Sequence, residues 1–165
     1  MNSKKTTLEP TAKLDLDLDI QWASCPSHFE QVGSARIRRW IKQALAPAVQ
    51  SAQITLRVVT KAEGQALNLA YRQKDYATNV LTFDYQTAPH LAADMVLCAP
   101  VVAAEAKAQG KLLKDHYAHL IIHGLLHAQG WDHETSAADA DEMEMTEGFL
   151  MLSLGLPQPY DEIND

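Results

Sequence analysis

Apolar and polar residues alternate strictly along LDLDLDIQW, residues 14–22. Successive side chains of a β-strand point to opposite faces, so this alternation predicts a half-buried strand at or near the edge of a sheet. Three further segments are rich in β-branched or apolar residues and also predict strands: 53–60, 80–85 and 94–99. Loops are expected over 73–79 and 86–93, on either side of the third strand.

The remaining apolar residues recur mainly at helical spacing. Ser34 is a favourable N-cap residue. Ile37, Ile41 and Leu45 follow it every four residues, which predicts an amphipathic helix. Comparable patterns bring the number of predicted helices to five: 35–46, 61–72, 100–109, 112–129 and 135–155. The order of these elements predicts an α+β fold, in which one small mixed four-stranded sheet is packed with about five helices, mainly on one face.

The length of 165 residues and the 47% of hydrophobic residues suit a single domain with a substantial core. We expect a flexible N-terminal segment over 1–13, one domain over 14–157 and a C-terminal tail over 158–165. No signal peptide or membrane span is visible, and Cys25 and Cys98 do not form a CxxC pair. These features predict a reduced, cytoplasmic protein with no membrane partner.

The charge is distributed unevenly along the chain. Residues 1–114 contain all 14 Lys and Arg and 10 acidic residues, a net +4, whereas residues 115–165 contain 11 acidic residues and no Lys or Arg, a net -11. The total of -7 therefore does not exclude a polyanionic partner, because binding depends on the local field. The acidic residues of the last predicted helix are interpreted as a solvated face.

Three histidines fall within HGLLHAQGWDH, residues 123–133. His123 and His127 are four residues apart on a predicted helix, so their side chains lie on one face, one turn apart. A continued helix would turn His133 away, because six residues rotate the side chain by about 600°. Gly130 can end the helix in a left-handed conformation, which turns the chain back and allows His133 to reach the same metal ion. The segment predicts a metal site on the long helix and the following loop, with His123, His127 and His133 as ligands.

Three neutral imidazoles leave one position of a tetrahedral zinc ion open, as in catalytic sites. One divalent ion is expected, with zinc as the first candidate; imidazole also suits nickel, copper and iron. Asp132 is either an outer partner of the last ligand or a surface residue. Four other histidines are interpreted as structural or surface residues: His28, His90, His116 and His119. Two alternatives stay open: His119 could be a fourth ligand that closes the site, or the helix is simply rich in histidine.

The same histidine spacing, with glycine three residues before the last histidine, occurs in the metzincin proteases. In those enzymes a glutamate base directly follows the first histidine. Here that position is Gly124, which has no side chain. Peptide hydrolysis by the metzincin mechanism therefore lacks its proton acceptor.

The wider sequence resembles the bacterial YbeY family of endoribonucleases over residues 53–155, with weaker similarity before them. The resemblance rests on ITLRVV, LNLAYRQKDYATNVLTF, ADMVLC followed by VVAAEA, and HGLLHAQGWDH. It implies a single-strand-specific, metal-dependent endoribonuclease in 16S rRNA 3′-end maturation and ribosome quality control. Its partners would be single-stranded RNA or rRNA and the ribosome or a ribosomal subunit. The implied site residues are Arg72 as the functional arginine, Lys74 as a substrate-binding position, and the ligands His123, His127 and His133.

The chain departs from the family pattern at three positions. Ala77 and Asp84 stand where proline is frequent, and Ala93 stands where glycine usually precedes Asp94. These changes leave the histidines and Arg72 intact. They concern the shape of the loops beside the expected cleft.

Phosphodiester cleavage needs an activated nucleophile and charge neutralisation at the phosphoryl oxygens. The ion would activate water or polarise a phosphoryl oxygen, and the planar guanidinium of Arg72 would bind two phosphate oxygens. The nucleophile is either water or the 2′-hydroxyl group of RNA. A surface salt bridge between Arg72 and Asp75 is the alternative for this arginine. The basic side chains of the first predicted helix either guide the RNA backbone or form a solvated face: Arg36, Arg38, Arg39 and Lys42.

The domain over 14–157 is therefore interpreted as a metallohydrolase domain. Two functions other than endoribonuclease activity remain as alternatives. A metallohydrolase of peptides or small molecules would use the same ion but would not depend on Arg72. A non-enzymatic ribosome-assembly factor would use the metal only to brace its fold and would never cut RNA.

Overall fold

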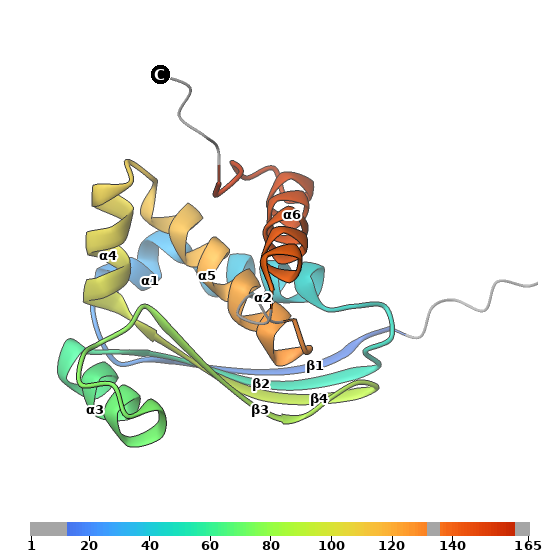
Figure 1. Ribbon diagram of the computed structural model, residues 1–165, viewed down its shortest axis with the longest axis horizontal. Helices are drawn as coiled ribbons and strands as arrows, with labels where there is room; N and C mark the ends of the chain where they lie inside the picture. Colours follow the sequence, from blue (N-terminus) through green and yellow to red (C-terminus); the bar gives the residue numbers. More distant parts are fainter. Residues whose placement is uncertain (1–12, 132–135, 161–165) are drawn as a thin grey trace, which may run out of the picture.

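The computed structural model describes residues 13–131 and 136–160, and its centre is a four-stranded mixed sheet (Figure 1). The strand order is β1-β2-β4-β3. β1 pairs with β2 and β2 with β4 in parallel, whereas β3 pairs with β4 antiparallel. The strands are β1 (Asp15–Trp22), β2 (Ser51–Val59), β3 (Val80–Gln86) and β4 (His90–Cys98). The predicted edge strand is confirmed, because β1 has only β2 beside it.

Six helices accompany the sheet in the described part of the chain. They are α1 (Pro26–Val32), α2 (Ser34–Ala44), α3 (Lys61–Arg72), α4 (Ala99–Ala108), α5 (Leu113–Ala128) and α6 (Ala137–Ser153). Most helices lie above the sheet in Figure 1, and α3 lies below it. The predicted α+β architecture is therefore confirmed. The sequence pattern does not predict α1, which has only 7 residues and buries only Val32.

The core follows the two faces of the sheet. The larger cluster packs alternate strand residues, such as Ile54, Leu56 and Met95, against α5 and the helices around it. A smaller cluster on the other face contains Val59, Val96 and Cys98, close to α3. This division explains why neighbouring residues in a strand belong to different clusters.

The prediction of a loop over 86–93 is wrong for the second half of that segment. β4 begins at His90, and its first residues pair with β2 through Ala52↔Leu91 and Ile54↔Ala93. Leu91 and Ala93 are almost completely buried. Pairing with a central strand therefore overrides the local turn composition of this segment.

α5 lies directly on the sheet and is buried along most of its length. A Cβ atom added at Gly124 would lie 2.9 Å from Thr82 Oγ1 and 3.1 Å from Met95 Sδ. Both distances are shorter than ordinary contacts, so the helix approaches β3 and β4 this closely only because residue 124 is glycine. This packing fixes the height of the histidine-bearing face above the sheet.

The end of α5 is formed as the sequence predicts. Gly130 has a left-handed φ of 97°, and its N–H donates to His127 O. The N–H of Trp131 then donates back to Leu126 O at 3.0 Å. His133 and Asp132 lie outside the described residues.

Both segments predicted at the ends, 1–13 and 158–165, lie largely outside the described residues. Within the described part of the chain, no helix is long and apolar enough to cross a membrane. Cys25 and Cys98 are both free thiols.

Candidate metal centre and adjoining cleft

The structure brings His123 and His127 together on one face of α5. Their Nε2 atoms are 3.1 Å apart, and the ring centroids are 4.6 Å apart. Two nitrogens that ligate one tetrahedral zinc at about 2.05 Å are separated by about 3.3 Å. The pair therefore fits a shared metal ion with little rearrangement. The third predicted ligand, His133, lies outside the described residues, so its place in this site stays a prediction.

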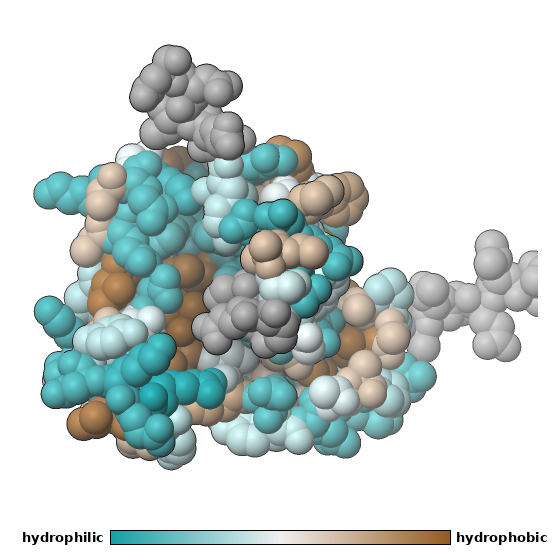
Figure 2. Space-filling model, viewed as in Figure 1, coloured by the Kyte–Doolittle hydropathy of each residue, from teal (hydrophilic) through white to brown (hydrophobic). Residues whose placement is uncertain are grey.

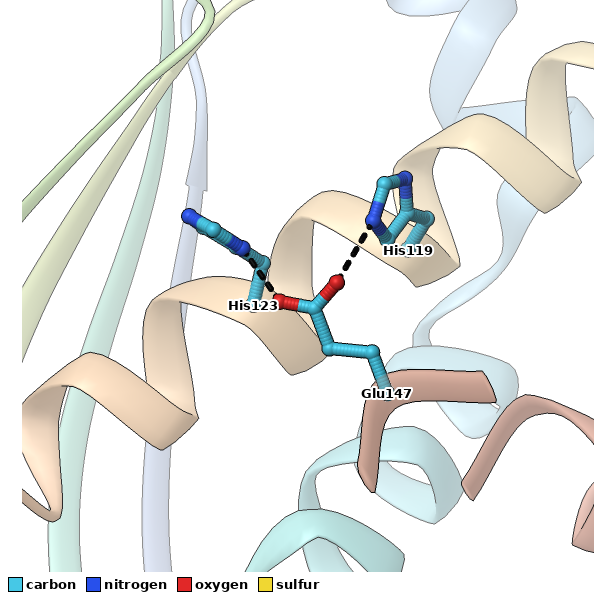
Figure 3. A group of neighbouring side chains, drawn as sticks. All are labelled: His119, His123 and Glu147. Atoms are coloured by element: carbon cyan, nitrogen blue, oxygen red, sulfur yellow. Dashed lines mark hydrogen bonds and ion pairs between the residues drawn. The ribbon is translucent and has the colours of Figure 1, made fainter. Parts of the chain in front are cut away.

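A buried carboxylate lies beside His123, the first histidine of this pair (Figure 3). Glu147 of α6 is hydrogen-bonded through Oε1 to His123 Nδ1 and through Oε2 to His119 Nε2, the second bond at 3.0 Å. The hydroxyl group of Tyr160 donates to Oε2 at 2.5 Å. Figure 3 shows both histidines reaching Glu147 from α5, with the other nitrogen of His123 pointing away from the carboxylate. Glu147 thus joins α5, α6 and the segment that follows α6.

His119, His123 and Glu147 form a group that could hold a metal ion, since one ligand atom from each lies within 4.8 Å of the others. The group would use His123 Nδ1, whereas the pair with His127 uses His123 Nε2. The two arrangements therefore place an ion on opposite sides of the same ring. His119, interpreted from the sequence as a structural or surface histidine, is nearly buried within this cluster.

Opposing effects act on the pKa of Glu147. Burial alone would raise the pKa, but hydrogen bonds from His119, His123 and Tyr160 outweigh it and lower the pKa to about 2. Glu147 is therefore an ionised acceptor at neutral pH. Burial and the adjacent carboxylate raise the pKa of the Tyr160 phenol above its usual range, so Tyr160 keeps its proton and donates a hydrogen bond to Glu147.

The interpretation of the α6 acids as a solvated face is wrong for Glu147, which is fully buried. The sequence contains a signal for it. Met143, Glu147 and Met151 recur every four residues, and all three are buried. An acid at a core position of an apolar series requires a partner inside the protein.

Arg72 lies in the last turn of α3 and points towards β3. Its Nη2 donates to Thr82 O at 2.9 Å, and its guanidinium carbon lies 5.6 Å from the centroid of the Phe83 ring. No ion pair links Arg72 to Asp75 within the described ranges; Asp75 instead accepts a hydrogen bond from Gln65. The salt-bridge alternative for Arg72 is therefore wrong in this structure.

One cleft of about 650 Å³ joins these features. Arg72, Lys74 and Tyr76 border it from α3 and the following loop, and His123 and His127 border it from α5. The other lining residues include Asn68, Thr78, Asn79, Val80, Leu81, Thr82, Asp84, Gly130 and Trp131. Figure 2 shows hydrophilic side chains gathered over α3 at the lower left. The predicted arginine and two predicted ligands therefore share one polar cavity.

The basic residues of α2 lie elsewhere. Arg36 donates to the carbonyl oxygens of Gln31 and Val32, and Arg38 donates to Leu16 O. Neither residue lines the cleft. These two arginines therefore bind the protein's own backbone.

Three other histidines have partners inside the fold. His116 Nε2 lies 3.1 Å from Glu105 Oε1, His28 Nδ1 lies 2.9 Å from Tyr117 Oη, and His90 Nδ1 lies 2.7 Å from Ser51 Oγ. Burial lowers the pKa of His116 and that of His28. The interpretation of these three as structural or surface histidines agrees with this arrangement.

Comparison with known proteins gives a consistent result. The model of the family described as Endoribonuclease YbeY matches residues 24–155. A protein named Endoribonuclease YbeY from Delftia acidovorans is 55% identical over 149 residues, which cover 90% of this chain and 96% of the relative. One with the same name from Paracidovorax citrulli is 55% identical over 148 residues, or 88% and 95% of the two chains. A solution structure from Thermotoga maritima has a TM-score of 0.52 at 17% identity, covering 91% of this chain and 99% of that one, so it supports the fold.

Proposed function

The chain belongs to the YbeY family of endoribonucleases, and we propose that it cuts single-stranded RNA with one bound divalent metal ion, zinc. The ion would be held by His123, His127 and His133 within a metallohydrolase domain over 14–157. The RNA would be 16S rRNA during 3′-end maturation and ribosome quality control. The protein would then act in the cytoplasm, with the ribosome or a ribosomal subunit as its partner.

The observation that carries this proposal is the shared cleft. The Nε2 atoms of His123 and His127 lie 3.1 Å apart, and both histidines line the same cavity as Arg72. When bound, a divalent ion supplies Lewis acidity and lowers the pKa of water. An ion beside a guanidinium group suits a phosphodiester, whose reaction develops negative charge on oxygen.

Arg72 has the geometry to bind phosphate. Its hydrogen bond to Thr82 O fixes the guanidinium group at the cleft wall. The guanidinium group has five N–H donors in one plane, so the others can form paired hydrogen bonds with two phosphate oxygens. Arg72 would therefore orient the phosphate and stabilise its charge.

A preference for single strands is supported by Tyr76. The tyrosine lines the cleft and is 54% exposed. Its backbone is held by the buried amide of Asn68, whose Nδ2 donates to Tyr76 O at 2.7 Å. An aromatic ring on a fixed backbone can stack against an unpaired base, which a duplex does not offer.

The peptidase alternative meets a steric obstacle. Even the Cβ atom of a glutamate at position 124 would lie 2.9 Å from Thr82 Oγ1 and 3.1 Å from Met95 Sδ, so the packed helix has no room for that side chain. Glu147 does not substitute for that base, because it is fully buried and is not among the residues that line the cleft. Together with family membership, this supports RNA rather than peptide as the substrate.

The test is cleavage of a labelled single-stranded RNA by the purified protein, with elemental analysis of the same samples. We expect His127→Ala to lose metal and activity, and Arg72→Ala to lose activity but retain metal. Arg38→Ala, which changes a cation outside the cleft, is the matched control and should cut like the unaltered protein. Full cleavage by both cleft variants would identify a contaminating nuclease. An unaltered protein that binds metal but never cuts RNA would instead be a metal-braced assembly factor.

A further inference from the structure

We infer that Glu147 is a positioning residue for the metal centre: its hydrogen bond to His123 Nδ1 selects the tautomer whose Nε2 lone pair faces His127. This role rests on the proposed use of His123 and His127 as ligands, and it extends the metal centre to a carboxylate outside the histidine motif.

The tautomer follows from the chemistry of the partners. An ionised carboxylate only accepts hydrogen bonds, so His123 must carry its proton at Nδ1 to bond Glu147. A neutral imidazole has one N–H, and its Nε2 therefore presents a lone pair. That atom lies 3.1 Å from His127 Nε2, on the cleft side of α5. The carboxylate thus determines which nitrogen of His123 is available to a cation.

Glu147 is itself held in place from the opposite side. Tyr160 Oη donates to Oε2 at 2.5 Å, and His119 Nε2 lies 3.0 Å from the same oxygen. Because Oε2 of an ionised carboxylate only accepts, His119 donates through Nε2, and its buried Nδ1 has no hydrogen-bond partner among the described residues. Two donors on Oε2 leave Oε1 directed at His123. The position of His123 therefore depends on α6 and on the segment after it.

Direct ligation by Glu147 is the competing arrangement, using the group of His119, His123 and Glu147. An ion there would displace the Glu147–His123 hydrogen bond and would use His123 Nδ1. It would then lie between α5 and α6, next to two residues that do not line the cleft, whereas His127 and Arg72 do line it. Ligation by His123 Nε2 and His127, with Glu147 outside the ligand set, keeps every hydrogen bond of Glu147 and leaves the ion in contact with the cavity.

A carboxylate that bonds the far nitrogen of a ligating histidine also makes the imidazole more basic. Loss of such an outer partner typically lowers metal affinity by 10- to 100-fold. We expect a decrease of about this size in zinc affinity for Glu147→Ala. Glu147→Gln, which is nearly isosteric and keeps an acceptor but no charge, should show a smaller decrease.

The experiment uses the full chain, free of metal, at a pH where its histidines are neutral. Nitrogen-15 NMR of the imidazoles should show His123 protonated at Nδ1 in the unaltered protein, and this signature should be lost in Glu147→Ala. Zinc affinity is measured on the same samples by competition with a coloured chelator. Glu142→Gln, an exposed acid on the same helix, is the control and should change neither readout. Circular dichroism checks that each variant is folded.

Unchanged tautomer and zinc affinity in Glu147→Ala would overturn the inference. Loss of zinc in Glu147→Ala with full retention in His127→Ala would also overturn it, in favour of direct ligation. If Glu147→Ala does not fold, Glu147→Gln and Tyr160→Phe decide the question, because Tyr160→Phe removes one donor to Oε2 without touching His123. Their zinc affinities should fall, and unchanged values in both would refute the role. A shifted tautomer in a protein that never cuts RNA would leave the inference standing and remove the proposed function.

Discussion

Replacement of Gly124 by alanine tests how closely α5 packs on the sheet. The added Cβ would lie 2.9 Å from Thr82 Oγ1 and 3.1 Å from Met95 Sδ. Overpacking of this kind costs about 1–3 kcal/mol, while alanine gains about 1 kcal/mol over glycine in a helix interior. Gly124→Ala should therefore lower the free energy of unfolding by up to about 2 kcal/mol.

Gly148 supplies a matched control on α6. The three atoms nearest to a Cβ atom there all belong to Gln158, and the closest lies at 3.5 Å, which is an ordinary contact. Gly148→Ala should therefore stabilise the protein by about 1 kcal/mol through helix propensity alone. Because that gain is common to both variants, the difference of about 1–3 kcal/mol between them isolates the packing at Gly124.

Urea denaturation of the metal-free proteins measures this difference directly. Displacement of α5 would also disturb the His123–His127 pair, so zinc affinity should fall for Gly124→Ala and not for Gly148→Ala. Equal stabilisation in both variants would show that α5 has room above the sheet. It would refute the steric explanation for glycine at this position.

The other predictions concern the cleft and the buried carboxylate. Arg72→Lys should reduce the cleavage rate by roughly 100-fold, because lysine cannot reproduce the paired hydrogen bonds to phosphate; retention of full rate would remove that role. Tyr76→Ala should weaken binding of single-stranded RNA by about 1–3 kcal/mol in a fluorescence titration. Tyr85→Ala, a similarly exposed ring that does not line the cleft, should leave binding unchanged, and equal losses would contradict base stacking. Glu147 has a folded-state pKa of about 2 against an ordinary value of 4.5, so it stabilises the fold at neutral pH and this contribution is lost as the pH falls from 4.5 towards 2. Glu147→Gln should reduce the decrease in the urea unfolding midpoint over this pH range. An unchanged decrease would show that other groups cause the acid sensitivity.

The features predicted best from the sequence are those that local pattern determines. The alternation over 14–22 identifies β1, the periodicity of α5 places His123 above His127, and Gly130 marks the end of that helix. Each of these features depends on residues that are close together in the sequence. Local pattern also identifies most of the helices, although it misses the short α1.

The features that sequence patterns miss depend on partners far along the chain. His90–Ala93 become strand because β2 provides a neighbour for Leu91 and Ala93, a contact between segments almost 40 residues apart. Glu147 is buried because two histidines of α5, 24 and 28 residues earlier, meet it across a helix interface. Such long-range pairings determine which side chains are buried and which stay ionised, and a short stretch of sequence does not contain both partners.

The row of carboxylates on β1 affects how copies of the protein meet in solution. Asp15, Asp17 and Asp19 alternate with inward-facing residues and are all exposed on this edge strand. A second copy adding to the edge in parallel register would bring like aspartates side by side at about 4.8 Å, the spacing of neighbouring strands. Their repulsion opposes growth of the sheet from one molecule to the next. The same alternation that buries one face of β1 therefore also protects its open edge against aggregation.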